Sequence, residues 1–198
     1  MEVIVLKEGY CREGEKKGSF KASGTITVVK GEHHNILVDT GNPWDTGELL
    51  SELSKANLEI KDIHYVVCTH GHSDHVGNLN IFLQSTHIVG HDIAYKDNYE
   101  DIAFKEGEPY EIEDNIEVIS TPGHMHHDIS VVVKNTKHGT VVIAGDLFEC
   151  EKDLDDSTIW KEKSEDKELQ EQSRQRVLEI ADYIIPGHGP GFKVPKPS

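Results

Sequence analysis

A chain of 198 residues is about the length of one domain, and 36% hydrophobic with 28% charged residues is typical of soluble globular proteins. Its formal charge of −16 argues against general electrostatic attraction to nucleic acid or to an anionic membrane, so an anionic ligand must be held locally. The N-terminus has a short apolar run without a basic start or a cleavage site, which predicts no secretory signal. We therefore expect residues 1–198 to form a single domain in the cytoplasm and nucleus, with no membrane partner.

The cysteines and histidines further restrict the classes of protein to which this chain can belong. Cys11, Cys68 and Cys150 lie far apart and form no Cys-x-x-Cys pair, which favours a reducing compartment over a disulfide scaffold. We interpret Cys68, at the end of an apolar run, as a buried small hydrophobe and not as a nucleophile. Histidine is unusually frequent, because its 13 copies equal Phe, Trp and Tyr together.

The first half of the chain predicts strands and one helix. Polar and apolar residues alternate over 25–29, a Lys-Gly-Glu turn follows, and an apolar run covers 35–39, which together indicate a β-hairpin. Thr46 is a candidate N-cap, and the helix that it begins would bury Leu49, Leu50, Leu53 and Ala56. The apolar run 65–68 predicts a buried strand that opens into a histidine-rich loop.

The second half predicts further strands and one long helix. Short apolar runs indicate strands at 87–89, 116–119, 129–133 and 141–144, with a polar hairpin connection over 134–139. The acidic segment 151–171 is expected to be a solvated loop that leads into a helix from about 164 to 180. Its apolar positions would be Leu169, Val177 and Ile180. Strands mixed with helices, without a repeat or a linker, predict one α/β unit.

The loop after the strand at 65–68 concentrates metal-binding side chains. His70, His72, Asp74 and His75 all lie within six residues. Histidine nitrogen and carboxylate oxygen are ligands that zinc, iron and manganese accept, and the lack of cysteine in the loop disfavours a closed structural zinc site. The loop therefore predicts an open, catalytic metal site.

Three more candidate ligands follow later in the chain. His124, Asp146 and His188 each come directly after a glycine, and apolar runs lead into the last two. A glycine lets the backbone turn sharply and approach an ion closely, while the strand before it fixes the direction of the side chain. The recurrence of this arrangement indicates that these residues join the histidine-rich loop.

The pattern His-x-His-x-Asp-His over 70–75, followed by single His, Asp and His ligands, resembles the signature of the metallo-β-lactamase superfamily. The resemblance spans nearly the whole chain. It implies a four-layer αββα sandwich with the metal site at one edge of the sheets. It also implies two divalent transition metal ions, zinc most readily and iron or manganese otherwise, with a metal-bridging hydroxide that hydrolyses the substrate.

Carried over by position, the resemblance implies a role for each ligand. His70, His72 and His124 would hold the first ion. Asp74, His75 and His188 would hold the second, and Asp146 would bridge the two. Asp74 would also act in catalysis, by orienting the nucleophile or accepting its proton. Asp39, which matches the superfamily's early aspartate, would support the loop from behind the ligands.

The resemblance also narrows the activity. An aspartate at position 146 disfavours a β-lactamase and resembles the glyoxalase II and nuclease branches. The segments 145–149 and 186–190 resemble a small, single-domain animal branch, which implies an endoribonuclease acting on the 3′ end of replication-dependent histone pre-mRNA. The chain's negative charge predicts weak nonspecific affinity for RNA, and so a need for a partner or a groove built by a homodimer.

Several alternatives stay open. A glyoxalase II-like thioester or lactone hydrolase acting on a small molecule would use the same ions. A persulfide dioxygenase with one iron and a noncatalytic metal-holding protein are disfavoured by the complete ligand set. His126 and His127 would either contact substrate or lie in an exposed turn, whereas His33, His34 and His138 are expected at the surface.

Overall fold

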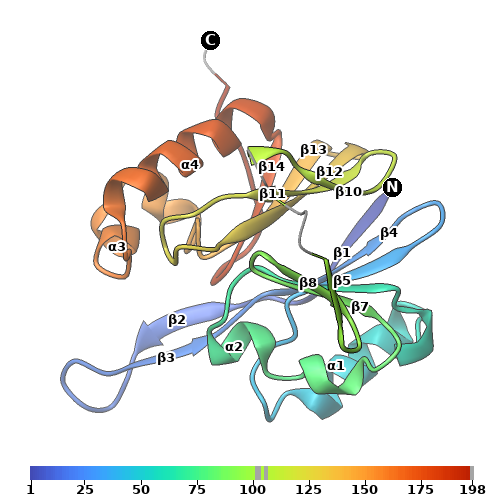
Figure 1. Cartoon of the computed structure of the whole chain (residues 1–198). Coiled ribbons are helices and arrows are strands. Elements are labelled where there is room, and N and C mark those ends of the chain that lie inside the picture. Colours follow the sequence, from blue (N-terminus) through green and yellow to red (C-terminus); the bar gives the residue numbers. More distant parts are fainter. Residues whose placement is uncertain (101–103, 105–106, 197–198) are drawn as a thin grey trace.

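Two β-sheets lie face to face between two layers of helices in the computed structural model, which describes residues 1–100, 104 and 107–196 (Figure 1). The first sheet has the strand order β1-β4-β5-β6-β7-β8-β9. Its strands are β1 (Glu2–Lys7), β4 (Ile26–Lys30), β5 (Asn35–Val38), β6 (Tyr65–Cys68), β7 (Thr86–Val89), β8 (Asp92–Tyr95) and β9 (Asn98–Glu100). Helix α1 (Thr46–Lys55) covers its outer face (Figure 1).

The second sheet comes from the C-terminal half and has the strand order β10-β11-β12-β13-β14-β15. Its strands are β10 (Tyr110–Glu113), β11 (Ile116–Ser120), β12 (Ile129–Thr136), β13 (Gly139–Gly145), β14 (Tyr183–Pro186) and β15 (Phe192–Lys193). Helix α4 (Lys167–Ile180) covers its outer face (Figure 1). The expected αββα layer order is therefore confirmed.

A separate hairpin and several short helices complete the fold. Strands β2 (Tyr10–Glu13) and β3 (Phe20–Ser23) pair only with each other among the described strands and project beyond the sandwich (Figure 1). The short helices are α2 (Ser73–Val76), α3 (Thr158–Lys161) and the 3-10 helices η1 (Ile60–Asp62), η2 (Leu79–Ile81) and η4 (Glu151–Leu154). Within the described residues, no helix is long and apolar enough to cross a bilayer.

The main core lies between the sheets. Val67 and Ile88 of the first sheet and Val118 and Val131 of the second are fully buried there. Because alternate strand residues point to opposite faces, the neighbours of these residues pack outward, against α1 or against α4. This packing fixes the two sheets relative to each other, and with them the loops at their shared edge.

The strand predictions are largely confirmed. The predicted hairpin corresponds to β4 and β5, and the apolar runs correspond to β6, β7, β11, β12 and β13. The predicted connection over 134–139 is shorter than expected, because β12 continues to Thr136 and β13 begins at Gly139. Cys68 is fully buried, as expected.

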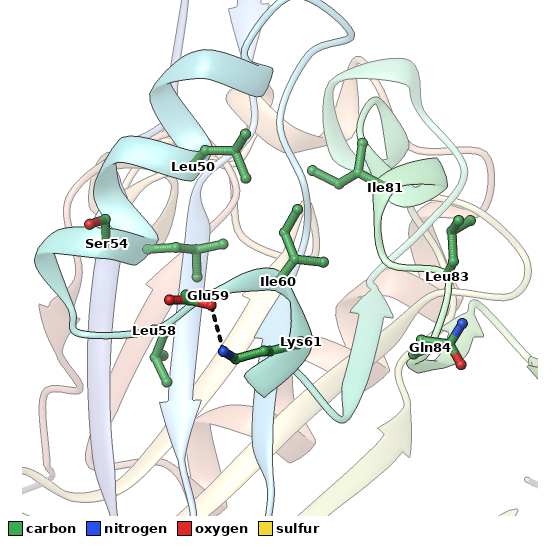
Figure 2. A pocket seen from close by; sticks show the side chains of 10 residues that line it. Leu50, Ser54, Leu58, Glu59, Ile60, Lys61, Ile81, Leu83 and Gln84 are labelled. Atoms are coloured by element: carbon green, nitrogen blue, oxygen red, sulfur yellow. Dashed lines mark ion pairs between the residues drawn. The ribbon is translucent and has the colours of Figure 1, made fainter.

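Two details of the first helix differ from the prediction. Asp45, not Thr46, is the N-cap residue of α1, and the Thr46 hydroxyl donates to Asn78 Oδ1 at 2.5 Å instead. Leu49 and Leu53 are buried, but Leu50 is 39% exposed. Leu50 lines an apolar surface hollow of about 540 Å³ beside η1, where Lys61 and Glu59 form an ion pair of 2.8 Å (Figure 2).

The acidic segment is more structured than predicted. Helix α4 begins at Lys167, after Asp166, whose carboxylate accepts the Leu169 N–H. Its buried face is mostly polar, because Arg174 inserts a guanidinium that binds Asp153 at 2.7 Å, and both side chains are at most 5% exposed. The predicted apolar position Ile180 is exposed instead. The prediction of a solvated loop over 151–171 is therefore wrong where it includes the buried Asp153.

Candidate metal centre

All seven predicted ligands meet at one edge of the sandwich. The ligands of the first half of the chain follow β6 or lie on α2, and those of the second half follow β11, β13 and β14. Ligand atoms lie within 4.8 Å of one another in two groups: His70, His72, His124 and Asp146 form one, and Asp74, His75 and His188 the other. These groups correspond to the two ion sites expected from the sequence.

The first group is a cluster of ring nitrogens that face each other. His72 Nδ1 lies 2.9 Å from His70 Nε2 and 3.2 Å from His124 Nε2. Asp146 Oδ2 lies 3.7 Å from His70 Nε2 and 3.5 Å from His124 Nε2. A cation among these atoms would satisfy all their lone pairs at once.

The second group lies on the other side of Asp146. Asp146 Oδ2 is 3.1 Å from His188 Nε2, and Asp146 Oδ1 is 3.2 Å from His75 Nε2. Asp74 Oδ2 lies 3.8 Å from His188 Nε2 and 3.9 Å from His75 Nε2. Asp146 thus contacts both groups, which is the position that a bridging carboxylate requires.

Several of these atoms have no hydrogen bond, which tests whether ions fit. Asp74 Oδ2, His75 Nε2 and Asp146 Oδ1 are buried without a hydrogen-bond partner among the described residues. Leaving buried polar atoms unpaired is unfavourable, and a metal ion is the partner that satisfies nitrogen and carboxylate oxygen together. The donor set is therefore compatible with two divalent ions.

Hydrogen bonds from outside the ligand set fix two of the imidazole rings. His75 Nδ1 lies 2.7 Å from Asp39 Oδ2, and His188 Nδ1 lies 3.1 Å from the carbonyl oxygen of Ser23. When Nδ1–H donates to these oxygens, the lone pair of Nε2 is left for an ion. Asp39 also accepts the Thr69 N–H at 2.8 Å, at the start of the ligand loop. Asp39 therefore lies where the sequence interpretation expects a supporting residue.

Charge and burial shift the histidine pKa values in opposite directions. Burial and the neighbouring His75 lower the pKa of His70 well below its usual value, and burial lowers the pKa of His124 to about 4. Burial also acts on His75 and His188, but nearby carboxylates outweigh it and raise the pKa of both. The His70 and His124 rings are therefore neutral at pH 7, which is the form that binds metal.

Two of the glycines before the ligands illustrate why the backbone requires glycine there. A Cβ atom at Gly187 would collide with Asp146 Oδ1, and one at Gly145 would collide with the Thr69 hydroxyl. Gly145 also has a φ of +52°, which side chains other than glycine rarely adopt. Close approach of the backbone is therefore part of the site.

Two residues beside the metal centre were not predicted. Glu149 is 2% exposed, and one of its carboxyl oxygens lies within 4.8 Å of ligand atoms of Asp146 and His188. Burial and the charge of Asp146 raise the pKa of Glu149 to about 7. Lys163 Nζ binds Glu149 Oε2 at 2.5 Å. Only the place of Glu149, three residues after Asp146, could have drawn attention to it in the sequence.

A pocket of about 470 Å³ opens onto the metal centre. Its lining includes candidate ligand residues, Phe20 and Ala22 of the projecting hairpin, and Lys163. Its volume is that of a small-molecule site. The hollow of Figure 2 has no candidate ligand among its described lining residues, so it is separate from this chemistry.

Several histidines outside the ligand set differ in their exposure. His33 and His138 are exposed as expected, whereas His34 is half-buried and lies 2.9 Å from Glu113. His126 and His127 are exposed in the loop that carries His124, and the His127 ring stacks on His91. The sequence left their role open, and they line a second pocket, which is described below.

Comparisons with known proteins agree with this geometry. The family model described as the metallo-beta-lactamase superfamily matches residues 21–188. The metallo-beta-lactamase domain-containing protein 1 of Xenopus laevis is 46% identical, over 98% of this chain and 82% of its own length. The protein of the same name from Homo sapiens is 39% identical, over 97% of this chain and 82% of its own length.

A solved structure shows the same fold at lower sequence identity. The crystal structure of a putative metallo-beta-lactamase from Thermotoga maritima superimposes with a TM-score of 0.72 and 19% identity, covering 97% of this chain and 98% of that one. Likeness at this identity supports the fold alone. The family model and the two relatives show that the chain belongs to the metallo-β-lactamase superfamily.

Proposed function

We propose that this chain is a hydrolase that uses two divalent metal ions, zinc in the first instance. The observation that carries the proposal is the pair of ligand groups that share Asp146, with buried and unpartnered atoms in each. When bound, two such ions supply positive charge at the reacting group and lower the pKa of a water, so that hydroxide forms at neutral pH.

The chain's own residues would hold and orient the reacting groups. The neutral rings of His70 and His124 need no deprotonation before they bind an ion. Asp39 and the Ser23 carbonyl keep the rings of His75 and His188 in one orientation. Fixed ligands of this kind hold the reacting groups in place with little reorganisation.

Asp74 is the proposed catalytic carboxylate. It lines the pocket, its side chain is 15% exposed, and its Oδ2 has no hydrogen-bond partner among the described residues. A carboxylate at this point can accept a hydrogen bond from the attacking water and then its proton. Asp74→Asn is expected to remove the proton acceptor while it keeps the shape of the side chain.

The finer proposal is an endoribonuclease that processes the 3′ end of replication-dependent histone pre-mRNA. Its support is the resemblance of segments 145–149 and 186–190 to the animal branch, and the two relatives that match nearly the whole chain. We propose that residues 1–198 act as one domain in the cytoplasm and nucleus. A homodimer would widen the surface that contacts RNA and so offset the weak attraction expected of an acidic chain.

A small-molecule ester or thioester hydrolase is the second candidate. Two observations favour it: the pocket at the metal centre has the volume of a small-molecule site, and the chain carries a net charge of −16. Phe20 and Ala22 offer apolar surface for an acyl group, and Lys163 offers a cation for a carboxylate. Both candidates use the same metal-binding residues.

One parallel assay tests the proposal. Zinc-loaded protein is incubated with a labelled histone pre-mRNA 3′ fragment and, separately, with a glutathione thioester, beside the His188→Ala protein. Since six ligands remain, the variant should fold, lose about one ion and lose most activity. RNA cleavage that the variant lacks supports the nuclease, and thioester turnover alone supports the second candidate. Turnover of neither substrate, or full activity of His188→Ala, contradicts the proposal.

A further inference from the structure

A second pocket, of about 390 Å³, borders the metal centre on the side of the His124 loop. We call it the histidine pocket. Its lining residues are His70, Gly71, Val89, Gly90, Met125, His126, His127, Asp128 and Glu165. Because His70 is both a proposed metal ligand and a lining residue, a molecule with its reacting group at the metal centre can extend directly into this pocket.

One wall of the histidine pocket is the end of a column of stacked rings. His127 stacks on His91, with ring centroids 4.9 Å apart and planes 17° apart. His91 stacks in turn on Phe104, at 4.9 Å and 24°. Ser120 Oγ, 2.9 Å from His91 Nε2, fixes the middle ring. His127 is exposed at the end of the column, so a flat ring can stack on it.

The backbone holds this wall close to the rest of the pocket. Gly90 lies in the turn between β7 and β8 with a φ of +54°. A Cβ atom there would lie 2.7 Å from the carbonyl oxygen of His127. The two loops therefore approach each other only because residue 90 is glycine. Val89 and Met125, both half-buried, give the pocket an apolar part.

The two carboxyl groups of the histidine pocket differ, because burial raises the pKa of Asp128 to about 8 and so keeps it largely protonated at pH 7, whereas Glu165 is exposed. Asp128 is 4% exposed; its Oδ2 accepts the Met125 N–H at 2.6 Å, and its Oδ1 has no partner among the described residues. Glu165 stands at the rim with its side chain 45% exposed. Among the described lining residues there is no lysine or arginine. The exposed carboxylate of Glu165 repels phosphate and can accept a hydrogen bond from an amino group on a flat ring.

We propose that the histidine pocket binds a nucleobase of the substrate, which stacks on His127 and donates a hydrogen bond from its amino group to the carboxylate of Glu165. The proposal rests on the endoribonuclease proposal, because it concerns a base next to the phosphodiester at the metal centre. It also accounts for RNA binding by an acidic chain. Contacts to bases require no basic surface, and stacking of bases on aromatic rings contributes to affinity in proteins that bind single strands.

Three small ligands test the proposal without any cleavage. Cytidine 5′-monophosphate and ribose 5-phosphate share a phosphate that can reach the metal ions, but only the first carries a base. Uridine 5′-monophosphate has nearly the same shape as the cytidine nucleotide, but it has an oxygen in place of the amino group. Isothermal titration of zinc-loaded protein with each ligand separates the contributions of phosphate, ring and amino group.

We expect the cytidine nucleotide to bind about tenfold more tightly than ribose 5-phosphate, which corresponds to one stacked base. His127→Ala should abolish this ratio, and His127→Phe should keep it, since phenyl also stacks. His138→Ala is the matched control, because His138 stacks on Tyr183 outside the pocket. Equal binding of the cytidine nucleotide and ribose 5-phosphate, or an unchanged ratio in His127→Ala, overturns the proposal. Equal binding of the cytidine and uridine nucleotides overturns the role of Glu165.

The outcomes separate this proposal from the endoribonuclease on which it rests. Cleavage of the histone pre-mRNA fragment with no preference for the cytidine nucleotide over ribose 5-phosphate leaves the nuclease and removes the nucleobase pocket. A preference that depends on His127, without cleavage of RNA, leaves a nucleotide-binding pocket and removes the nuclease.

Discussion

The carboxylate of Glu113 links the two sheets, and its removal should destabilise the fold measurably. Glu113 ends β10 of the second sheet, but its side chain binds the turn between β4 and β5 of the first. Its Oε1 accepts the Glu32 N–H at 2.7 Å, and its Oε2 accepts the N–H groups of His33 and His34, each at 3.1 Å. A Cβ atom on Gly31 would collide with this carboxylate.

The magnitude follows from the number of hydrogen bonds lost in Glu113→Gln. The amide oxygen can still accept, but the NH₂ group then faces backbone N–H donors on its other side. Hydrogen bonds to a charged group contribute about 1.5–3 kcal/mol each. In the variant, water can bind some of the freed N–H groups, because the turn lies at the edge of the sheet, and so recovers part of the lost free energy. We expect the free energy of unfolding to fall by about 2–3 kcal/mol. For a domain of this size, the melting temperature would fall by roughly 4–12 °C.

The same contact predicts a pH dependence with a definite sign. Burial opposes ionisation of Glu113, but the backbone N–H groups and His34 outweigh it and lower the pKa of Glu113 below its usual value of 4.5. A group with a lowered pKa in the folded state stabilises above its unfolded pKa. That contribution is lost as the pH falls through the folded-state pKa. The difference between wild type and Glu113→Gln should therefore shrink as the pH falls below ~4.5.

Urea unfolding of metal-free protein between pH 7 and pH 4 measures this difference without a contribution from metal release. Glu111→Gln, on the same strand and exposed, is the matched control and should change stability by less than about 0.5 kcal/mol. If Glu113→Gln unfolds like the control, or if its deficit is the same at both ends of the pH range, the reasoning is wrong.

Three further variants or treatments test other parts of the molecule. Asp39→Asn keeps the φ of +58°, which asparagine tolerates, but weakens the acceptor for His75. Metal affinity should therefore fall about 10- to 100-fold in a chelator competition. Unchanged affinity would contradict the supporting role. Arg174→Met leaves the buried Asp153 uncompensated and should lower the unfolding free energy by about 3–5 kcal/mol in urea, with recovery in the double variant with Asp153→Leu. Chelation should lower the melting temperature. If the free metal had been at 100 times its Kd, the free energy of unfolding should fall by about 2.7 kcal/mol. A melting curve that chelator does not move would argue against bound ions.

The predictions that succeeded rest on local patterns. The sequence could indicate which candidate ligands come together, because metal chemistry needs particular residue types and because glycine marks the places where the backbone approaches closely, as at Gly145 and Gly187. The strands β6, β12 and β13 could be predicted because their residues are apolar on both faces, as expected for strands between a core and a helix layer.

The predictions that failed depend on contacts distant in sequence. The polar face of α4 is buried because Arg174 binds Asp153 and stacks over Phe148 at 4.1 Å. The spacing of apolar residues in the sequence cannot predict such an ion pair. Strand β1 was missed because its residues are at most half-buried, at the edge of the first sheet. Glu149 was missed because only the folded chain brings it to His188.

The division of the ligands between the two sheets has a consequence for folding. The first sheet and its loops contribute four ligands, His70, His72, Asp74 and His75, and the second contributes His124, Asp146 and His188. Neither half of the chain holds the bridging carboxylate together with both histidine groups. Full metal capture must therefore follow the docking of one sheet on the other. In a refolding experiment, uptake of an ion at either complete ligand group would report the docking of the two sheets.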